Sequence, residues 1–401
     1  MFDSDSIFFL IKNLKISTRR RDKLLYCMIF IFAAIFILSA KTLAAEELVF
    51  PSASWDEADP ESQGFDPSKL NDALSYLSAN SGGDGISEVV IIRNGYMIWK
   101  GNNVNKVHGV WSATKSFTST VLGLLIDDGK AELDSPADAY VRAIFPGITL
   151  RHFATMTSGY LAVGDEPKGS YVHGPSSTPF TPSENPLFSP PGYIYAYWDS
   201  AMNQFVNVMT RIANEPIAEF FKRRIADPIG MNSKQWNWGD FGVIDGILVN
   251  GGSGNNNKQI RISAIEIARL GHLFLNHGKW NGIQLISSSW VSKATSVQVP
   301  ASIPLHQLSG ADGRGVYGFN WWVNGISPDG NRKWVKATEG TYAAMGYNNN
   351  TMFVIPEWNM VIVRLGLDSS DFSIKDDIYS NFLGMISEAI RYGRKKGMVH
   401  N

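Results

Sequence analysis

Two apolar segments joined by a turn signal form the first regular pattern along the chain. Residues 87–92 and 96–99 are mainly apolar, β-branched or aromatic, and Asn94-Gly95 stands between them. An Asn-Gly pair in this position is a strong signal for a two-residue hairpin, because both turn positions need a left-handed backbone. The pattern predicts two adjacent antiparallel strands.

Helical spacing follows from Lys115 to Asp127, where apolar side chains recur three or four positions apart and Asp127-Asp128-Gly129 ends the run. Similar spacing predicts helices at 202–222, 263–276 and 374–394, and apolar runs predict strands at 320–323, 333–338, 351–355 and 360–365. Residues 164–192 are rich in Pro, Ser and Gly and predict a long loop beside a cleft.

The order of these elements predicts the fold class. Strands come first, a long helical middle follows, and strands and a last helix complete the chain. We expect an α/β (α+β) fold in which the early and late strands share one antiparallel sheet with helices on both faces. Residues 130–310, approximately, are then a mainly helical insertion, and a cleft lies between the two parts.

The N-terminal 45 residues resemble an export signal. Basic residues at 19–21 and 23 precede an apolar run at 24–40, and small residues follow at 44 and 45. We expect residues 1–45 to be a signal peptide and residues 46–401 the exported, periplasmic domain. The alternative is an uncleaved anchor through residues 24–40, since about 17 apolar residues suffice to span a bilayer. The folded domain would then sit on the outer side of the cytoplasmic membrane.

Composition narrows the classes of partner. Residues 1–45 carry seven Lys/Arg and three Asp/Glu, so removing them from a chain of net charge −1 leaves −5, which argues against nucleic acid. The only cysteine, Cys27, lies inside the apolar run, so the domain has neither a disulfide nor a catalytic thiol. The 12 Trp, 14 Tyr and 22 Phe indicate an aromatic core or cleft.

Ser112 and Lys115 are the first candidate catalytic pair. They are three positions apart at the start of the predicted helix, so both side chains project from one face. A lysine can take a proton from a serine only when it is neutral, and the positive field of a helix start favours that form. An exposed helix start with a solvated lysine is the alternative for so short a motif.

Two further segments support a site. Pro191-Gly192 leads to Tyr197-Trp198-Asp199 after the long loop, and Gly346-Tyr347 precedes the apolar strand at 351–355.

The string G-R-G-V-Y-G at 313–318 matches a dinucleotide fingerprint, but a strand is predicted after it where that motif needs a helix. No metal-binding spacing is present, and core or capping roles suit His152, His272 and His277.

Taken together, these motifs resemble the serine β-lactamase-like family, which includes class C β-lactamases, low-molecular-weight penicillin-binding proteins, esterases and nylon-oligomer hydrolases. The likeness covers about Phe50 to Arg394. It rests on S-A-T-K at 112–115, L-R-H-F-A-T-M-T-S-G at 150–159, P-G-Y-I-Y-A-Y-W-D at 191–199 and R-I-S-A-I-E-I-A-R-L-G at 261–271.

The resemblance implies a role for each matching residue. Tyr197 would be the phenol that moves protons between Ser112 and the leaving group. The backbone N–H groups of Ser112 and Tyr347 would form the oxyanion hole. Asp199 stands where the family has Asn and would bind substrate, with a solvated carboxylate as the alternative. Gly346 and Asn348 would also contact substrate, although a polar turn is the alternative for Asn348.

The family's third motif, Lys-Thr-Gly, falls on Ala344-Met345-Gly346, which keeps only the glycine. The lost cation and hydroxyl hold the substrate carboxylate in penicillin-type enzymes, so we predict a hydrolase of a small ester or amide with a Ser112 acyl-enzyme and no cofactor or metal. One alternative is a β-lactamase or D,D-peptidase that recruits Arg314, Lys333 or Lys336. A non-catalytic binding or sensor protein is the other.

Overall fold

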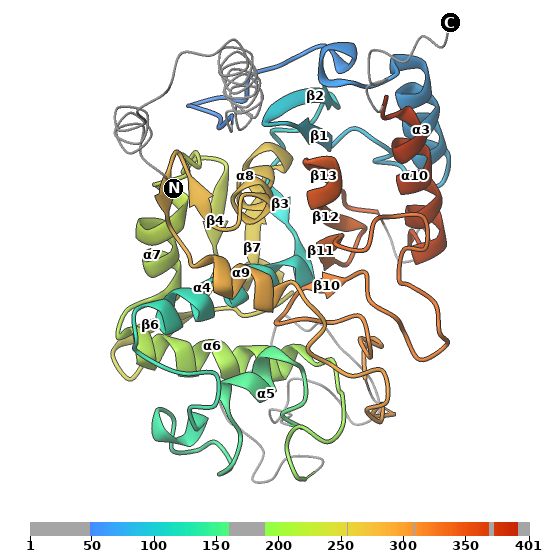
Figure 1. Cartoon of the computed structure of the whole chain (residues 1–401). Coiled ribbons are helices and arrows are strands. Elements are labelled where there is room, and N and C mark those ends of the chain that lie inside the picture. Colours follow the sequence, from blue (N-terminus) through green and yellow to red (C-terminus); the bar gives the residue numbers. More distant parts are fainter. Residues whose placement is uncertain (1–48, 160–188, 255, 308, 369–372, 392–401) are drawn as a thin grey trace, which may run out of the picture. The chain divides into compact units, whose positions relative to one another are not determined.

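The computed structural model describes residues 49–159, 189–254, 256–307, 309–368 and 373–391 (Figure 1). The signal or anchor predicted in residues 1–45, including the apolar run 24–40, lies outside them. Most of the loop predicted at 164–192 also lies outside them. Among the described residues, no helix combines the length and the apolar character needed to cross a membrane.

A six-stranded antiparallel sheet is the centre of the fold, with the order β10-β11-β12-β13-β1-β2. Its strands are β1 (Val89–Arg93), β2 (Tyr96–Lys100), β10 (Trp322–Val323), β11 (Tyr342–Gly346), β12 (Asn350–Ile355) and β13 (Met360–Arg364). Strand β1 pairs with β13, so the early and late strands share one sheet, as predicted. The β1–β2 turn has φ of 52° at Asn94 and 84° at Gly95, the left-handed pair that Asn-Gly favours.

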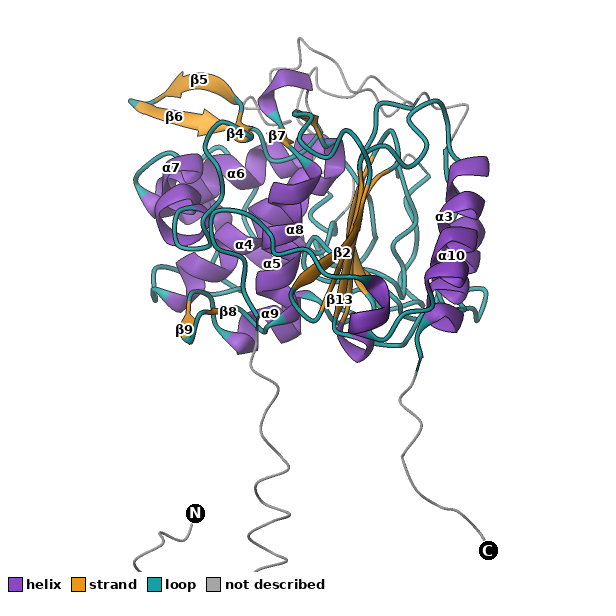
Figure 2. Ribbon diagram, turned by 90° about the horizontal axis from the view of Figure 1, so that it is seen from above, coloured by secondary structure: helices purple, strands orange, loops and turns teal. Residues whose placement is uncertain are grey.

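Helices cover both faces of the sheet, which confirms the predicted fold class (Figure 2). Helices α3 (Pro67–Ala79) and α10 (Asp376–Ala389) pack together on one face, and α8 (Ala264–Leu275) lies on the other against β12 and β13. At Gly271 of α8, a Cβ would come within 2.7 Å of Val361 Cγ1 and 2.9 Å of Met352 Sδ. The absence of a side chain there lets the helix lie close to the strands.

The middle of the chain combines helices with short strands. The helical segments are η2 (Trp111–Ala113), α4 (Thr114–Asp127), α5 (Leu150–Ala154), α6 (Asp199–Ala213), α7 (Ile217–Phe221), η4 (Lys222–Ala226) and α9 (Ser288–Ala294). The strands are β3 (His108–Gly109), β4 (Trp236–Trp238), β5 (Asp240–Ile244), β6 (Ile247–Asn250), β7 (Ile260–Ile262), β8 (Lys279–Trp280) and β9 (Ile283–Gln284). Short turns η1 (Pro60–Gln63), η3 (Ala137–Ala139), η5 (Asn256–Lys258) and η6 (Pro356–Trp358) complete the elements.

Two predicted elements are wrong in detail. The helix predicted at 202–222 is broken between α6 and α7, where Asn214 takes a left-handed φ of 57° and Pro216 follows. Residues 333–338 form turns and not a strand. The side chain of Asn324 bonds to backbone groups of Trp334 and Thr338, so these groups pair with an amide side chain instead of a neighbouring strand.

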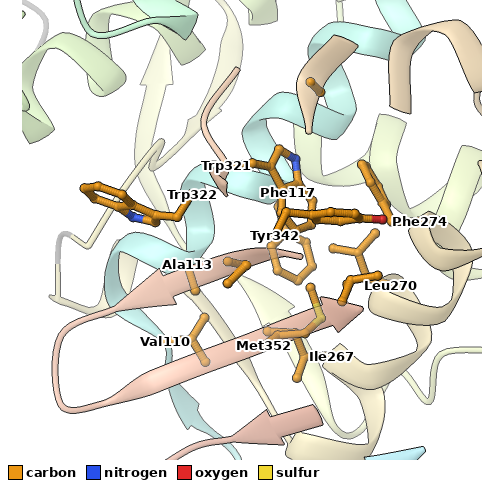
Figure 3. Close-up of a cluster of buried hydrophobic side chains, with 14 of the residues drawn as sticks. Val110, Ala113, Phe117, Ile267, Leu270, Phe274, Trp321, Trp322, Tyr342 and Met352 are labelled. Atoms are coloured by element: carbon orange, nitrogen blue, oxygen red, sulfur yellow. The ribbon is translucent and has the colours of Figure 1, made fainter. Parts of the chain in front are cut away.

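Part of the hydrophobic core packs against the start of α4. Val110, Ala113 and Phe117 pack there against side chains of α8 and of the sheet (Figure 3). The partners drawn with them are Ile267, Leu270, Phe274, Trp321, Trp322, Tyr342 and Met352. These contacts join the start of α4 to α8 and to the central sheet. They therefore hold residues 111–115 in a fixed position relative to β11.

Stability is expected to fall in mild acid because of His272. Burial lowers the pKa of this imidazole to about 4, and its Nε2 lies 2.8 Å from the Val49 carbonyl. The unfolded chain would bind a proton near pH 6.5 and the folded chain only near pH 4, so unfolding becomes easier as the pH falls through this window. We expect a loss of about 2 kcal/mol between about pH 7 and pH 5. Urea unfolding at the two pH values measures it, and a His272→Gln variant should show a smaller change.

Candidate active site

Ser112 lies in η2, two residues before the helix α4 begins. The residue before it, Trp111, has a left-handed φ of 52°, an uncommon conformation for a bulky side chain. Its backbone N–H donates to Gln259 Oε1, and its ring packs edge-on against Tyr347 with centroids 5.5 Å apart. Contacts on both sides of the tight turn therefore hold the backbone that carries Ser112.

Lys115 lies within hydrogen-bond reach of Ser112, as the three-residue spacing predicts. Its Nζ is 2.7 Å from Ser112 Oγ, and the lysine side chain is only 1% exposed. The same Nζ lies 2.5 Å from Asp199 Oδ1 and also bonds to Ser253 Oγ. The alternative of a solvated lysine at an exposed helix start is therefore wrong.

Asp199, the first residue of α6, is 2% exposed, so it is not a solvated carboxylate. Its Oδ1 pairs with Lys115 and also accepts a hydrogen bond from Ser253 Oγ. A carboxylate is stabilised at a helix start by the N-terminal field, and here it also accepts hydrogen bonds from Lys115 Nζ and Ser253 Oγ. Asp199 thus contacts the candidate base, and the predicted contact of Asp199 with substrate stays a prediction.

Tyr197 lies against the same lysine, with its ring centroid 4.4 Å from Lys115 Nζ. Burial is the main cause that raises the pKa of this phenol, the negative charge of Asp199 raises it further, and a hydrogen bond with Ser112 opposes the shift. A phenol with a raised pKa keeps its proton at neutral pH. Tyr197 can therefore donate a proton, while Lys115 is the group that can accept one.

Strand β11 brings Gly346 and Tyr347 to the other side of Ser112. A Cβ at Gly346 would lie 2.0 Å from the Val110 carbonyl oxygen and 3.1 Å from Ser112 N. The strand end approaches the serine backbone so closely that no side chain fits between them. Ser112 and Tyr347 line the same cleft, so the structure brings together the two backbone segments predicted to form the oxyanion hole.

A buried ion pair stabilises the turn after β11 through hydrogen bonds to Asn348 and Asn349. Asn348 and Asn349 have φ of 61° and 62°, and Arg364 Nη1 donates to the carbonyl of Asn348 at 3.2 Å. Arg364 pairs with Asp368, whose Oδ2 also accepts from Asn349 Nδ2 at 2.9 Å. Asn348 lines a smaller neighbouring pocket of about 120 Å³, and its predicted contact with substrate stays a prediction.

Ser253 belongs to this cluster and was missed by sequence reasoning. It follows β6 in the segment Gly251-Gly252-Ser253-Gly254 and is fully buried. It lies 138 positions after Lys115 in the chain, and no local spacing connects the two. The glycines around it were the available signal, because they indicate a close backbone approach.

The cleft that contains Ser112 has a volume of about 370 Å³. Near the serine its lining is largely aromatic or apolar, with Tyr197, Trp322, Met345 and Tyr347. An aromatic cleft of this kind accommodates an apolar acyl or alcohol group.

Charged groups line the remainder of the cleft, and they are paired. Lys333 Nζ lies 2.8 Å from Asp376 Oδ2 and 4.4 Å from the centre of the Trp322 ring. Asp312, also on the lining, accepts from Arg314 at 2.7 Å. Among the three cations that we considered as substitutes for the lost third-motif lysine, only Lys333 lines this cleft.

No group of three or more histidine, cysteine or acidic side chains gathers in metal-binding geometry within the part of the chain that the structure describes. The candidate site consists of a hydroxyl, an amine, a phenol and backbone amides. This set can carry out nucleophilic acyl transfer with proton movement between its own side chains.

Comparison with known proteins identifies the family. The Beta-lactamase family model matches residues 85–368, which include Ser112, Lys115, Tyr197 and Gly346. The chain belongs to the Beta-lactamase family. Its fold is therefore that of the family's serine hydrolases.

Individual members of the family match at low identity. The D-alanyl-D-alanine-carboxypeptidase/endopeptidase AmpH of Escherichia coli K12 is 27% identical over 222 residues, which cover 49% of this chain and 55% of that protein. A Bacillus anthracis structure provisionally named a 6-aminohexanoate-dimer hydrolase matches with a TM-score of 0.58 at 19% identity, covering 86% of this chain and 88% of the other. An octameric penicillin-binding protein homologue from Pyrococcus abyssi matches with a TM-score of 0.56 at 17% identity, covering 80% and 78%.

Proposed function

We propose that this protein is a serine hydrolase that cleaves an ester or amide bond of a small molecule through an acyl-enzyme on Ser112. The observation that carries the proposal is the 2.7 Å contact between Lys115 Nζ and Ser112 Oγ inside a cleft that Tyr197 and Tyr347 also line. A nucleophile bonded to a buried base next to an open cleft is the arrangement that acyl transfer needs.

In the first step, Ser112 Oγ attacks the substrate carbonyl carbon while its proton moves to Lys115 Nζ. The carbonyl π electrons move to oxygen, and the backbone N–H groups of Ser112 and Tyr347 stabilise the resulting oxyanion. The bond to the leaving group then breaks, and the leaving group takes a proton from Tyr197, which Lys115 replaces. The products of this step are the acyl-enzyme and a free alcohol or amine.

In the second step, water attacks the acyl-enzyme. The water proton passes through the same Tyr197 and Lys115 groups, and Ser112 leaves with a proton restored. The balance of the two steps is one water consumed and one acid and one alcohol or amine released. The side chains return to their starting protonation states without any cofactor.

The cleft favours an uncharged substrate over one that carries a carboxylate. Strand β11 has Ala344 and Met345 where a cation and a hydroxyl would hold such a group. Lys333, the cation on the lining, already pairs with Asp376, and Asp312 adds a second carboxylate nearby. An anionic substrate would have to compete with these groups for the lysine.

Labelling with an alkyl fluorophosphonate tests the proposed function. The wild-type protein should be labelled, and Ser112→Ala should not be. Folded wild-type protein that resists the probe and cleaves no ester would favour the non-catalytic binding or sensor alternative. Rates on short acyl esters and on nitrocefin then separate esterase from β-lactamase activity, and fast nitrocefin turnover without ester cleavage would overturn the preferred substrate class.

The β-lactamase or D,D-peptidase alternative depends on Lys333, so its ion pair offers a direct prediction. Asp376→Asn removes the ion-pair partner of Lys333 and frees its ammonium to bind an anionic group in the cleft. We expect kcat/KM for an acyl ester with a terminal carboxylate to rise about tenfold relative to its neutral analogue, the size of one charge-assisted hydrogen bond. Asp377→Asn, at the next and exposed position, is the matched control and should leave the ratio unchanged. An unchanged ratio in both variants would contradict the prediction.

A further inference from the structure

The hydroxyl of Ser253 completes the surroundings of the Lys115 amine. Ser253 Oγ accepts a hydrogen bond from Lys115 Nζ and donates one to Asp199 Oδ1. Asp199 Oδ1 itself lies 2.5 Å from the same Nζ. Lys115, Ser253 and Asp199 therefore form a closed ring of three hydrogen bonds. Ser112 contacts the same Lys115 amine but is not part of this ring.

The chemistry of these groups fixes the direction of each bond. A neutral lysine amine is tetrahedral and has two N–H donors and one lone pair. The Asp199 carboxylate can only accept, and Ser253 has committed its single proton to Asp199, so Ser253 can only accept from Lys115. Both N–H donors of the neutral amine are thus used by these two groups. The third contact of Nζ, with Ser112 Oγ at 2.7 Å, is then the one left for the lone pair when the amine is neutral.

The segment that carries Ser253 is built to lie close to α6, the helix that Asp199 begins. A Cβ at Gly252 would be 2.3 Å from the Met202 carbonyl oxygen, and the backbone N–H of Gly252 donates to Asn203 Oδ1 at 3.2 Å. The glycine therefore sets the separation between this segment and the helix. Ser253 and Asp199 are held as one unit around the lysine.

We propose that Ser253 is a positioning residue whose hydroxyl, together with Asp199, orients the Lys115 amine so that its lone pair faces Ser112. The inference rests on the proposed function, since it concerns the step in which the Ser112 O–H bond breaks and the Lys115 N–H bond forms. After that transfer the ammonium donates to Ser112, Ser253 and Asp199, and all three of its protons are paired. Without the Ser253 hydroxyl, the amine can turn an N–H toward Ser112, and fewer encounters are productive.

Inactivation kinetics with the fluorophosphonate test this role. In Ser253→Ala we expect the maximal inactivation rate kinact to fall between about tenfold and a hundredfold, while the half-saturating probe concentration KI stays within about twofold. A merely structural role would not separate the two constants in this way. Ser119→Ala is the matched control, because Ser119 is a fully buried serine of α4 whose hydroxyl has no hydrogen-bond partner within the described residues. It should keep the wild-type kinact.

The outcomes separate this inference from the proposed function. Equal kinact in Ser253→Ala and wild type, with Ser112 labelled in both, overturns the role of Ser253 and leaves the serine hydrolase intact. Absence of labelling in folded wild-type protein overturns both. Circular dichroism checks the fold of each variant. If Ser253→Ala does not fold, Ser253→Cys is the test, because a thiol is a weak hydrogen-bonding group of similar size. A kinact at least about fivefold below wild type supports the role of Ser253. An unchanged kinact overturns it.

Discussion

Replacing Lys115 with methionine is expected to lower kcat/KM for a short acyl ester by about 10²- to 10⁴-fold, the usual contribution of a general base. Methionine fills much of the same buried space but cannot take the proton of Ser112. The variant also leaves the Asp199 carboxylate buried without its Lys115 partner, since the two side chains are only 1% and 3% exposed. The free energy of unfolding should therefore fall by about 3 to 5 kcal/mol.

A second substitution separates the two effects of this change. Asp199→Asn in the Lys115→Met background removes the uncompensated charge, so part of the lost stability, about 2 kcal/mol, should return. Catalysis should stay at the level of Lys115→Met, because the base is still missing. Ester kinetics and urea unfolding of both variants measure this. Recovery of activity in the double variant would show that Lys115 acts through the fold alone and not as the base.

Sequence reasoning reached the parts of the site that short spacings encode. Ser112 and Lys115 are three positions apart on one helical segment, so local geometry alone predicts that their side chains meet. The segments of Tyr197 and Gly346 were recognised from the sequence, but their roles came from the family resemblance, because nothing local connects them to Ser112. Neither local spacing nor the family resemblance pointed to Ser253. Its contact with Lys115 depends on how the segment after β6 packs against α6, which no pattern of alternating polarity records.

The fold shows the same division between local and distant causes. The Asn94-Gly95 hairpin and the α4 helix are encoded by their own residues and were predicted closely. Residues 333–338 have the composition of a strand, yet Asn324 takes their backbone hydrogen bonds. A single buried amide from another segment can therefore override a local strand preference, as tertiary context often does. The turn matters for function, because its first residue, Lys333, lines the cleft.

The approach of β11 to the nucleophile leads to the second large effect. In Gly346→Ala, the new Cβ would lie 2.0 Å from the Val110 carbonyl oxygen and 3.0 Å from Ala113 N. These are backbone atoms, so β11 or the segment 110–113 must shift to make room. Either shift moves Tyr347 N–H relative to Ser112 N–H. Because one misplaced oxyanion-hole donor costs about 10²- to 10³-fold in kcat, we expect a loss of at least about a hundredfold.

The size and kind of this loss distinguish an oxyanion-hole defect from general damage. KM should change little, since Tyr197 and Trp322 keep the cleft walls, and steady-state ester kinetics give kcat and KM separately. Gly83→Ala is the control: a Cβ at Gly83 meets nothing within 4 Å, so this variant should keep wild-type kinetics. If Gly346→Ala retained kcat within about twofold, β11 would not supply the oxyanion donor. Gly346 is the one residue kept from the family's third motif, so its effect on kcat also tests why this glycine is needed when the cation and hydroxyl are lost. The close backbone approach at Gly346 would serve every acyl substrate. The cation and hydroxyl would serve only substrates that carry a carboxylate.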